Sequence, residues 1–173
     1  LTGGSYASGA GELEASTRQG RFSLFAHTGV AGARNDYPFR NDNGTLFDPT
    51  DDRDDRRLNA HYVREHGLVH ARYAAGGTSV DLVWFGFGHQ RGDPGPGDRQ
   101  ALETHARLNR QFTTLSVKHE GRAGVHPFRV QGVFAHTHER LHYEDPQREI
   151  GMTAEDVVMR TRGLEGRVAG SID

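Results

Sequence analysis

Hydrophobic and polar residues alternate with a period of two along most of this 173-residue chain. Phe22, Leu24 and Val30 share one side of an extended segment, and Ser23 and His27 lie on the other side. Such alternation is typical of β-strands with two different faces, and the longer period of an amphipathic helix is hard to find. The pattern therefore predicts an all-β protein.

Seven long strands are predicted from the alternation and from the turn residues that interrupt it. We expect them near residues 4–17, 20–33, 57–74, 78–90, 100–119, 127–142 and 161–172. They exceed the roughly 5–6 residues of a typical globular strand and the roughly 9–11 residues that cross a tilted bilayer. In two of them, near 64–66 and 109–113, the apolar positions change sides. A β-bulge or the end of a membrane-embedded stretch would explain each change.

Short and long connections alternate between the predicted strands. Residues 19–20, 75–77 and 121–127 are tight links, whereas 34–56, 91–99 and 143–160 are long polar loops. Outer-membrane β-barrels have short turns on the periplasmic side and longer loops outside. The alternation favours antiparallel strands of a transmembrane β-barrel over other all-β folds.

The composition indicates a fold with little apolar interior. Hydrophobic residues make up 34% of the chain and the mean hydropathy is −0.73, whereas soluble domains are about 45–50% apolar. Regularly spaced aromatic residues argue against disorder. A soluble β-sandwich would also alternate, so a soluble all-β ligand-binding domain is the main alternative.

The net charge, the cysteine content and the first residues exclude some classes of function. The net charge is −2, which gives no footprint for nucleic acid, so we expect no nucleic-acid partner. Cysteine is absent, which excludes disulfides and thiolate metal sites. The first residues, 1–6, do not have the pattern of a signal peptide. Either the mature chain starts at residue 1 or, as we expect, it is a fragment of a longer protein.

Several short motifs resemble TonB-dependent outer-membrane receptors, and they occur in plausible order along the whole chain. They are GGSY at 3–6, YPFRNDNG at 37–44, FDPTDDR at 47–53, RRLNA at 56–60, GDPGPGDRQ at 92–100, DP at 145–146 and EIG at 149–151. The plug, the TonB box and the C-terminal aromatic residue of the family have no counterpart in this sequence. Residues 1–173 would then be a partial barrel, about seven strands of a 22-stranded family.

This resemblance implies a place and a function. The parent protein would lie in the outer membrane of a Gram-negative bacterium and import a scarce nutrient such as a siderophore, a corrinoid or another chelate. Its partners would be membrane lipid, the small-molecule ligand, and the TonB energising complex acting through a plug that this chain lacks. No enzymatic activity is expected, because no catalytic motif such as G-x-S-x-G is present.

The first long loop holds the predicted ligand-binding residues, which the resemblance suggests. Tyr37, Phe39, Arg40 and Asn41 lie at its start, and aromatic and arginine side chains often anchor ligands. The alternative is that Tyr37 and Phe39 belong to the aromatic belt found at membrane interfaces.

The same loop is rich in aspartate and is the expected place for a calcium ion, the one cofactor considered. Asp48, Asp51, Asp52 and Asp54 are the candidate ligands, and some family members bind calcium in such loops. The spacing does not match an EF-hand, which needs a distal glutamate. The alternative is a solvated loop whose acids pair with nearby arginines.

Histidines give the remaining metal hypothesis. His136 and His138 would share one strand face, and with Glu144 they suggest a cupin-like metal-binding protein. The spacing to Glu144 differs from the cupin pattern by about one residue. The alternative is that His136 and His138 are ordinary rim histidines of a polar lumen or headgroup layer.

Overall fold

The computed structural model describes residues 1–45, 47–151 and 156–172, and their secondary structure is entirely β. The strands are β1 (Thr2–Gly4), β2 (Ser8–Gln19), β3 (Phe22–Ala33), β4 (Pro38–Asn41), β5 (Arg53–Arg56), β6 (Tyr62–Ala75), β7 (Thr78–Gly92), β8 (His105–Ala123), β9 (His126–Glu144) and β10 (Asp156–Ile172). The all-β prediction is confirmed. None of the described residues belongs to a helix with the length and apolar character needed to cross a membrane.

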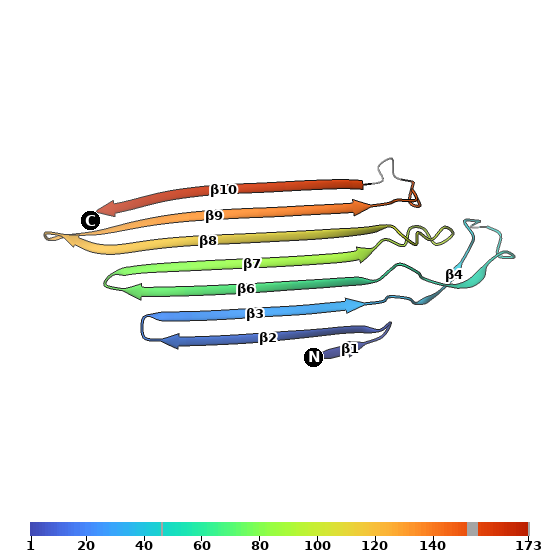
Figure 1. Cartoon of the computed structure of the whole chain (residues 1–173), viewed down its shortest axis with the longest axis horizontal. Helices are drawn as coiled ribbons and strands as arrows, with labels where there is room; N and C mark the ends of the chain where they lie inside the picture. The colour runs from blue at the N-terminus through green and yellow to red at the C-terminus, as the bar shows by residue number, and fades with distance from the viewer. Residues whose placement is uncertain (46, 152–155, 173) are drawn as a thin grey trace.

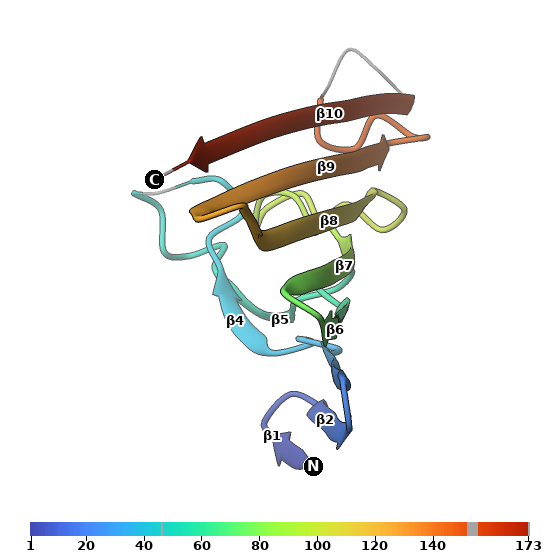
Figure 2. The ribbon, with the colours of Figure 1, turned by 90° about the vertical axis from the view of Figure 1, so that its left-hand side faces the viewer.

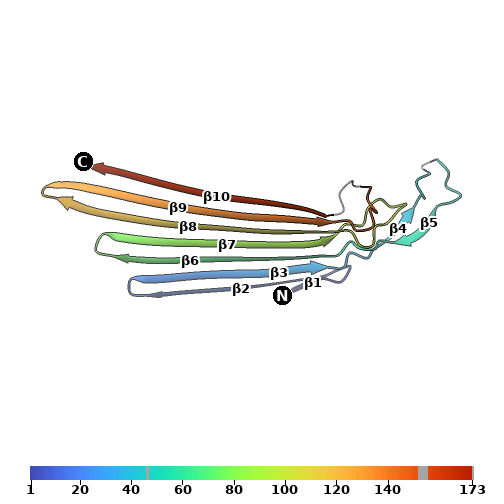
Figure 3. The same ribbon diagram turned by 45° about the horizontal axis from the view of Figure 1, so that its top comes forward.

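Eight strands form one antiparallel sheet in the order β1-β2-β3-β6-β7-β8-β9-β10 (Figure 1). The sheet is open, with β1 and β2 at one edge and β10 at the other (Figure 2). β4 and β5 form a separate hairpin beyond the strand ends, on the excursion from β3 to β6 (Figure 3). Each strand contacts only its sheet neighbours, so the sheet is a single layer.

Strand positions differ from the sequence prediction mainly at the loop end. The expected strand at 4–17 is divided by a turn where Tyr6 and Ala7 have positive φ angles of 58° and 53°. Residues 57–61 and 100–104 belong to loops, whereas β8 extends to Ala123. The predicted loop 34–56 contains the β4–β5 hairpin, and residues 46 and 152–155 of the predicted loops lie outside the described residues.

Tight turns lie at one end of the sheet and long loops at the other (Figure 1). The turns are the two-residue links 20–21, 76–77 and 124–125. Gly76 and Gly77 have φ angles of 55° and 80°, as in the turns that suit the twist of a hairpin and favour glycine. The expected alternation of short and long connections is therefore present.

Register assigns every side chain to one of two faces, because directly paired residues point to the same side of a sheet. The pairs Leu24↔Ala71, Ala71↔Leu82, Leu82↔Leu115 and Leu115↔Phe134 place an apolar row on one side. We call this side the belt face. The other side, which we call the opposite face, carries Asp81, paired with Arg72 and Ser116.

An apolar belt covers the belt face next to the tight turns. Its members are Leu13, Ala15, Thr17, Phe22, Leu24, Ala26, Thr28, Val69, Ala71, Tyr73, Val80, Leu82, Trp84, Thr113, Leu115, Val117, Phe128, Val130, Gly132, Phe134, Leu164, Gly166, Val168, Gly170 and Ile172. No charged residue is among them. On β9 the belt runs from Phe128 to Phe134, about 20 Å along the strand at roughly 3.4 Å per residue.

Beyond the belt, the polarity of the two faces is exchanged. On β8, Leu115 and Val117 lie on the belt face, whereas Leu108 and Phe112 lie on the opposite face. The pairing of β6 and β8 with their neighbours runs one to one through 64–66 and 109–113. The β-bulge explanation is therefore wrong, and the change of sides marks the end of the belt.

The described residues contain almost no hydrophobic core. Their buried hydrophobic side chains are Ala31, Ala33 and Ala101. Belt residues are open instead: Leu13 is 75% exposed and Val168 is 83% exposed. A sheet with one apolar face is normally covered by a second layer, and within the described chain nothing covers the belt.

Trp84 covers two glycines at the margin of the belt that lies nearer the long loops. A Cβ atom on Gly67 would lie 3.1 Å from Trp84 Cζ3, and one on Gly86 would lie 2.7 Å from Trp84 Cη2. The indole therefore lies over both glycines, one on its own strand and one on β6. Large rings commonly cover strand glycines in this way.

The β6–β7 turn yields a stability prediction. Gly77→Ala should destabilise the chain more than Gly76→Ala, because a Cβ on Gly77 would clash with the Glu120 carbonyl oxygen, whereas Gly76 has open space around it. Both substitutions carry the positive-φ penalty of about 1–2 kcal/mol. Urea titration followed by fluorescence of Trp84, the single tryptophan, measures the difference. Equal midpoints for the two variants would contradict the close approach of Gly77 to β8.

Candidate functional site

The predicted ligand-binding residues lie in and just before the β4–β5 hairpin and are held by neighbours. The Tyr37 ring meets the Tyr6 ring edge to face at 5.7 Å. The Arg57 guanidinium lies over the Phe39 ring, 5.7 Å from its centroid. Arg40 forms ion pairs with two aspartates of the same loop. Ligand contact by Tyr37, Phe39 and Arg40 stays a prediction.

Asn41 differs from the other three because its side chain is buried, with 2% exposure. Its amide nitrogen donates to Asp55 Oδ2 at 3.2 Å, and its Oδ1 accepts from the Asn43 backbone N–H at 3.0 Å. Both ends of the amide are therefore used inside the loop, where they shape the hairpin.

The aspartates proposed as calcium ligands form hydrogen bonds or ion pairs with other residues of the loop. Asp48 accepts from the backbone N–H and hydroxyl of Thr50, which lower the pKa of Asp48. Asp51 accepts from the Thr45 hydroxyl at 2.7 Å. Asp52 and Asp54 lie 3.3 Å and 3.5 Å from Arg40 nitrogens. Among the described residues these four carboxylates do not gather into a group of metal-ligand spacing, and calcium binding stays a prediction.

His136 and His138 share the belt face, as the sequence suggested; His136 lies at the margin of the belt, between Thr113 and Leu164, and His138 lies beyond it. They lie opposite Thr113 and Gln111 of β8 and opposite Leu164 and Arg162 of β10. Glu144 is at the loop end of the strand, where His105 Nε2 is 2.6 Å and His142 Nε2 3.0 Å from its carboxylate. In the described chain His136 and His138 have no third ligand nearby, so their arrangement does not support a cupin-like centre.

A buried network at the loop end joins the loop 93–104 to residues 145–151. Thr104 and Asp145 are completely buried. The Thr104 hydroxyl donates to Asp145 Oδ1 at 2.9 Å, and the Glu149 and Ile150 backbone N–H groups donate to the same carboxylate at 2.8 Å and 3.2 Å. Glu149 in turn accepts from the Leu102 and Glu103 backbone N–H groups, both at 2.9 Å.

These hydrogen bonds keep both acids ionised. Burial acts to raise the pKa of Asp145, but the donors Glu149 N, Thr104 Oγ1 and Ile150 N outweigh it and lower the pKa below its usual 3.8. The pKa of Glu149 lies below its usual 4.5, chiefly because of the Leu102 and Glu103 backbone donors. Charged acceptors of this kind form stronger hydrogen bonds than neutral ones.

Further hydrogen bonds join the loop 93–104 to the segment that precedes β6. Asn59 Nδ2 donates to the Thr104 carbonyl at 2.7 Å and to the Asp93 carbonyl at 3.3 Å. Gln100 Oε1 accepts from the Leu58 backbone N–H at 2.7 Å, and Gln100 Nε2 donates to the Arg56 carbonyl at 2.9 Å. The three long loops are thus joined in series, and the residues that join them belong to the motifs at 56–60, 92–100 and 145–151 or adjoin them.

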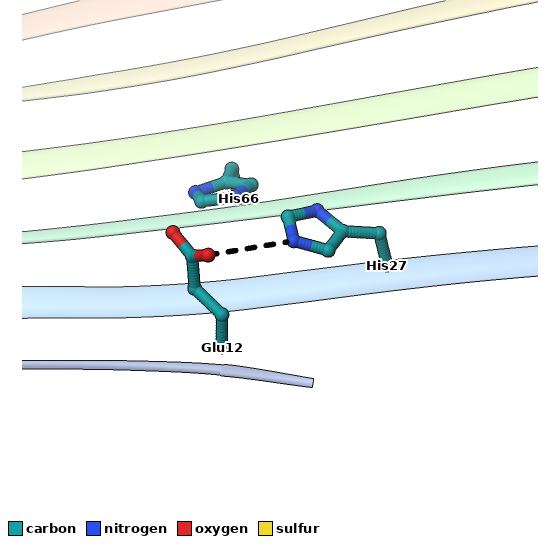
Figure 4. A group of neighbouring side chains, drawn as sticks. All are labelled: Glu12, His27 and His66. Carbon is teal, nitrogen blue, oxygen red and sulfur yellow. Dashed lines mark ion pairs between the residues drawn. The ribbon is translucent and has the colours of Figure 1, made fainter. Parts of the chain in front are cut away.

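A cluster that sequence reasoning missed lies on the opposite face of β2, β3 and β6, where Glu12, His27 and His66 turn toward one another (Figure 4). One ligand atom from each side chain lies within 4.8 Å of the others. His27 Nε2 is 3.9 Å from Glu12 Oε2, and the two imidazole rings have centroids 5.2 Å apart.

Strand register creates this cluster. Glu12 pairs with Gly29 and Gly29 pairs with His66, so the three residues form a row across the sheet. His27 precedes Gly29 by two residues and shares its face. No sequence motif links these positions, and only correct pairing of three strands would have revealed them. Two imidazoles and a carboxylate can bind a first-row transition metal.

No protein-family model matches the chain, and the search of curated proteins gives no match either. The functional interpretation therefore depends on the geometry of the sheet and its loops.

The loop network yields a prediction about local order. Asp145→Ala should speed hydrogen exchange at the Glu149 and Ile150 amides by about tenfold or more, because their charged acceptor is lost. Hydrogen exchange read by mass spectrometry or NMR measures the effect. Asp98→Ala is the matched control, since Asp98 is an exposed aspartate of the neighbouring loop. Equal exchange in the two variants would show that Asp145 does not hold the loops.

Proposed function

We propose that the chain forms part of the wall of a transmembrane β-barrel in a Gram-negative outer membrane. The parent would be a receptor of the TonB-dependent type that imports a scarce nutrient such as a siderophore, a corrinoid or another chelate. The observation that carries the proposal is the apolar belt on one face of a single-layer sheet. In this arrangement the belt faces the lipid chains.

Exposure of the apolar belt to water would be energetically unfavourable. Leu164 is 72% exposed and Ile172 is 76% exposed, and covering a side chain of this size contributes about 1.5–3 kcal/mol. Soluble monomers rarely show contiguous apolar patches beyond a few hundred Å². Lipid covers such a belt without a second protein layer, and outer-membrane barrels carry an apolar band about 25 Å tall.

Basic residues next to the belt fit the headgroup layer of a membrane. Arg107, Arg140, Arg160 and Arg162 lie on the belt face, on the loop side of the belt. Among the described residues none of these guanidinium groups has an ion-pair partner. Cationic side chains at this level would meet lipid phosphates. This supports an orientation with the long loops outside and the tight turns in the periplasm.

The opposite face fits the inside of a large barrel. Next to the turns it carries ion pairs between neighbouring strands or positions, such as Lys118 with Glu120 at 2.8 Å and Arg129 with Glu120 at 2.9 Å. Nearer the loops it becomes apolar, with Leu68, Phe85 and Phe112 in one row. In the proposed receptor the ionic part faces water, and the apolar row faces the plug.

The open edges of the sheet favour a large parent barrel. β10 pairs with β9 alone among the described strands, and unpaired edges are not tolerated in lipid. Additional strands of the parent would close the barrel. In that assembly, the loop hairpin with Tyr37, Phe39 and Arg40 lies on the side from which the ligand arrives.

Trp84 allows a direct test of the belt. In vesicles that hold the parent barrel with Trp84 as its single tryptophan, bromine atoms on the lipid chains should quench Trp84 fluorescence, and acrylamide in the water should quench it weakly. The double variant Trp84→Phe, Val83→Trp moves the indole to the opposite face and should reverse both results. A chain that is monomeric in plain buffer, melts cooperatively and has Trp84 shielded there would instead be a soluble all-β domain.

A pair of arginine substitutions tests the two faces by stability. Leu115→Arg places a charge in the belt and should destabilise the membrane-inserted parent barrel by about 2–4 kcal/mol. Ser116→Arg, one residue along, points to the opposite face beside Asp81 and should have little effect. Urea titration in vesicles gives both values. Comparable losses at the two positions would contradict the assignment of the faces.

A further inference from the structure

Glu12 and His66 converge over a glycine. A Cβ atom on Gly29 would lie 2.5 Å from His66 Cε1 and 3.1 Å from Glu12 Cγ, so both side chains occupy the space that any other residue would fill. His27 reaches the same space from two positions along β3, with its ring tilted 36° to that of His66. The absence of a side chain at Gly29 therefore lets residues from three strands meet.

The two imidazoles have few other partners. Within the described chain, the ion pair between His27 and Glu12 and the ring contact between the histidines are the polar and aromatic interactions of these side chains. His27 is partly covered, with 25% side-chain exposure, and Glu12 is 69% exposed and able to move. Ring nitrogens without strong protein hydrogen bonds are free to act as ligands.

We propose that Glu12, His27 and His66 form a binding site for a divalent first-row transition metal, with Zn²⁺ as the representative ion. Zinc binds histidine nitrogen and carboxylate oxygen at about 2.0–2.2 Å. The three ligand atoms lie within 4.8 Å of one another. Modest rotation of the side chains, mainly of exposed Glu12, would bring each atom to about 2.0–2.2 Å from a single bound ion.

The two imidazoles and the carboxylate of the site indicate which class of metal ion it would bind. Calcium and magnesium prefer shells of oxygen atoms, whereas imidazole suits zinc, copper, iron and nickel. Three protein ligands leave a position for water or for a further carboxylate. Glu14 pairs directly with His27 across β2 and β3, and it is the nearest candidate for that position.

This site does not depend on the proposed membrane location. The three residues share the opposite face of the sheet, away from the belt. In a barrel wall that face lies inside the barrel, and His27 lies in the same row as Leu68 and Phe85. The site would also persist in a soluble domain with the same sheet.

The test is a Co²⁺ titration of the full chain, in whichever medium circular dichroism shows that its β-sheet forms. Cobalt is a spectroscopic substitute for zinc, and the visible absorption of the bound ion reports imidazole ligation. We expect one ion per chain, displaced by Zn²⁺. Glu12→Gln, His27→Ala and His66→Ala should each weaken binding more than about tenfold, since even outer-shell partners contribute about 10–100-fold.

Two further variants separate ligand loss from misfolding. Gly29→Ala keeps all three ligands but fills the space where they meet, and it should weaken binding as well. The double variant His136→Ala, His138→Ala removes two imidazoles from the belt face and should leave binding intact. The proposal fails if the folded chain binds no Co²⁺, if the triad variants bind normally, or if the double variant alone abolishes binding.

Discussion

The apolar belt, which no second layer of the described chain covers, is the constraint on which the rest of the structure depends. A protein of this size usually hides its large apolar side chains between two layers, and here they are spread over one face of one layer. Neighbouring strands supply backbone hydrogen bonds but no cover. Leu13, Leu164 and Val168 are thus largely exposed, and any cover for them would come from outside the described residues.

Order at the loop end has a different source. Where the apolar belt ends, hydrogen bonds replace hydrophobic packing: Thr104, Asp145 and Glu149 join two loops, and Asn59 joins a third. Buried polar groups are stable only when they are fully paired, and Asp145 has three donors. The loops therefore hold one another in place without a core.

The sequence predicted the strands well and the loops poorly, for physical reasons. Alternation reveals a half-buried strand at once, so β3, β7 and β9 lie within two residues of their expected bounds. The strands of the β4–β5 hairpin are four residues each, with Phe39 as their one large apolar side chain, and give no such signal. The sequence shows that the apolar residues of β8 change faces. Only the one-to-one pairing with β7 and β9 shows that no β-bulge causes this change. Likewise, His136 and His138 were visible as neighbours in sequence, whereas Glu12 and His66 meet only through Gly29.

The two-residue turns have a consequence for how the sheet is assembled. If the register between two strands shifted by one residue, Asp81 or Arg129 would point to the belt face. Leu82 or Val130 would then point to the opposite face. Because only Gly76 and Gly77 connect β6 and β7, this two-residue turn favours a single register for the β6–β7 hairpin. The short turn therefore helps to determine which face of the sheet each side chain occupies.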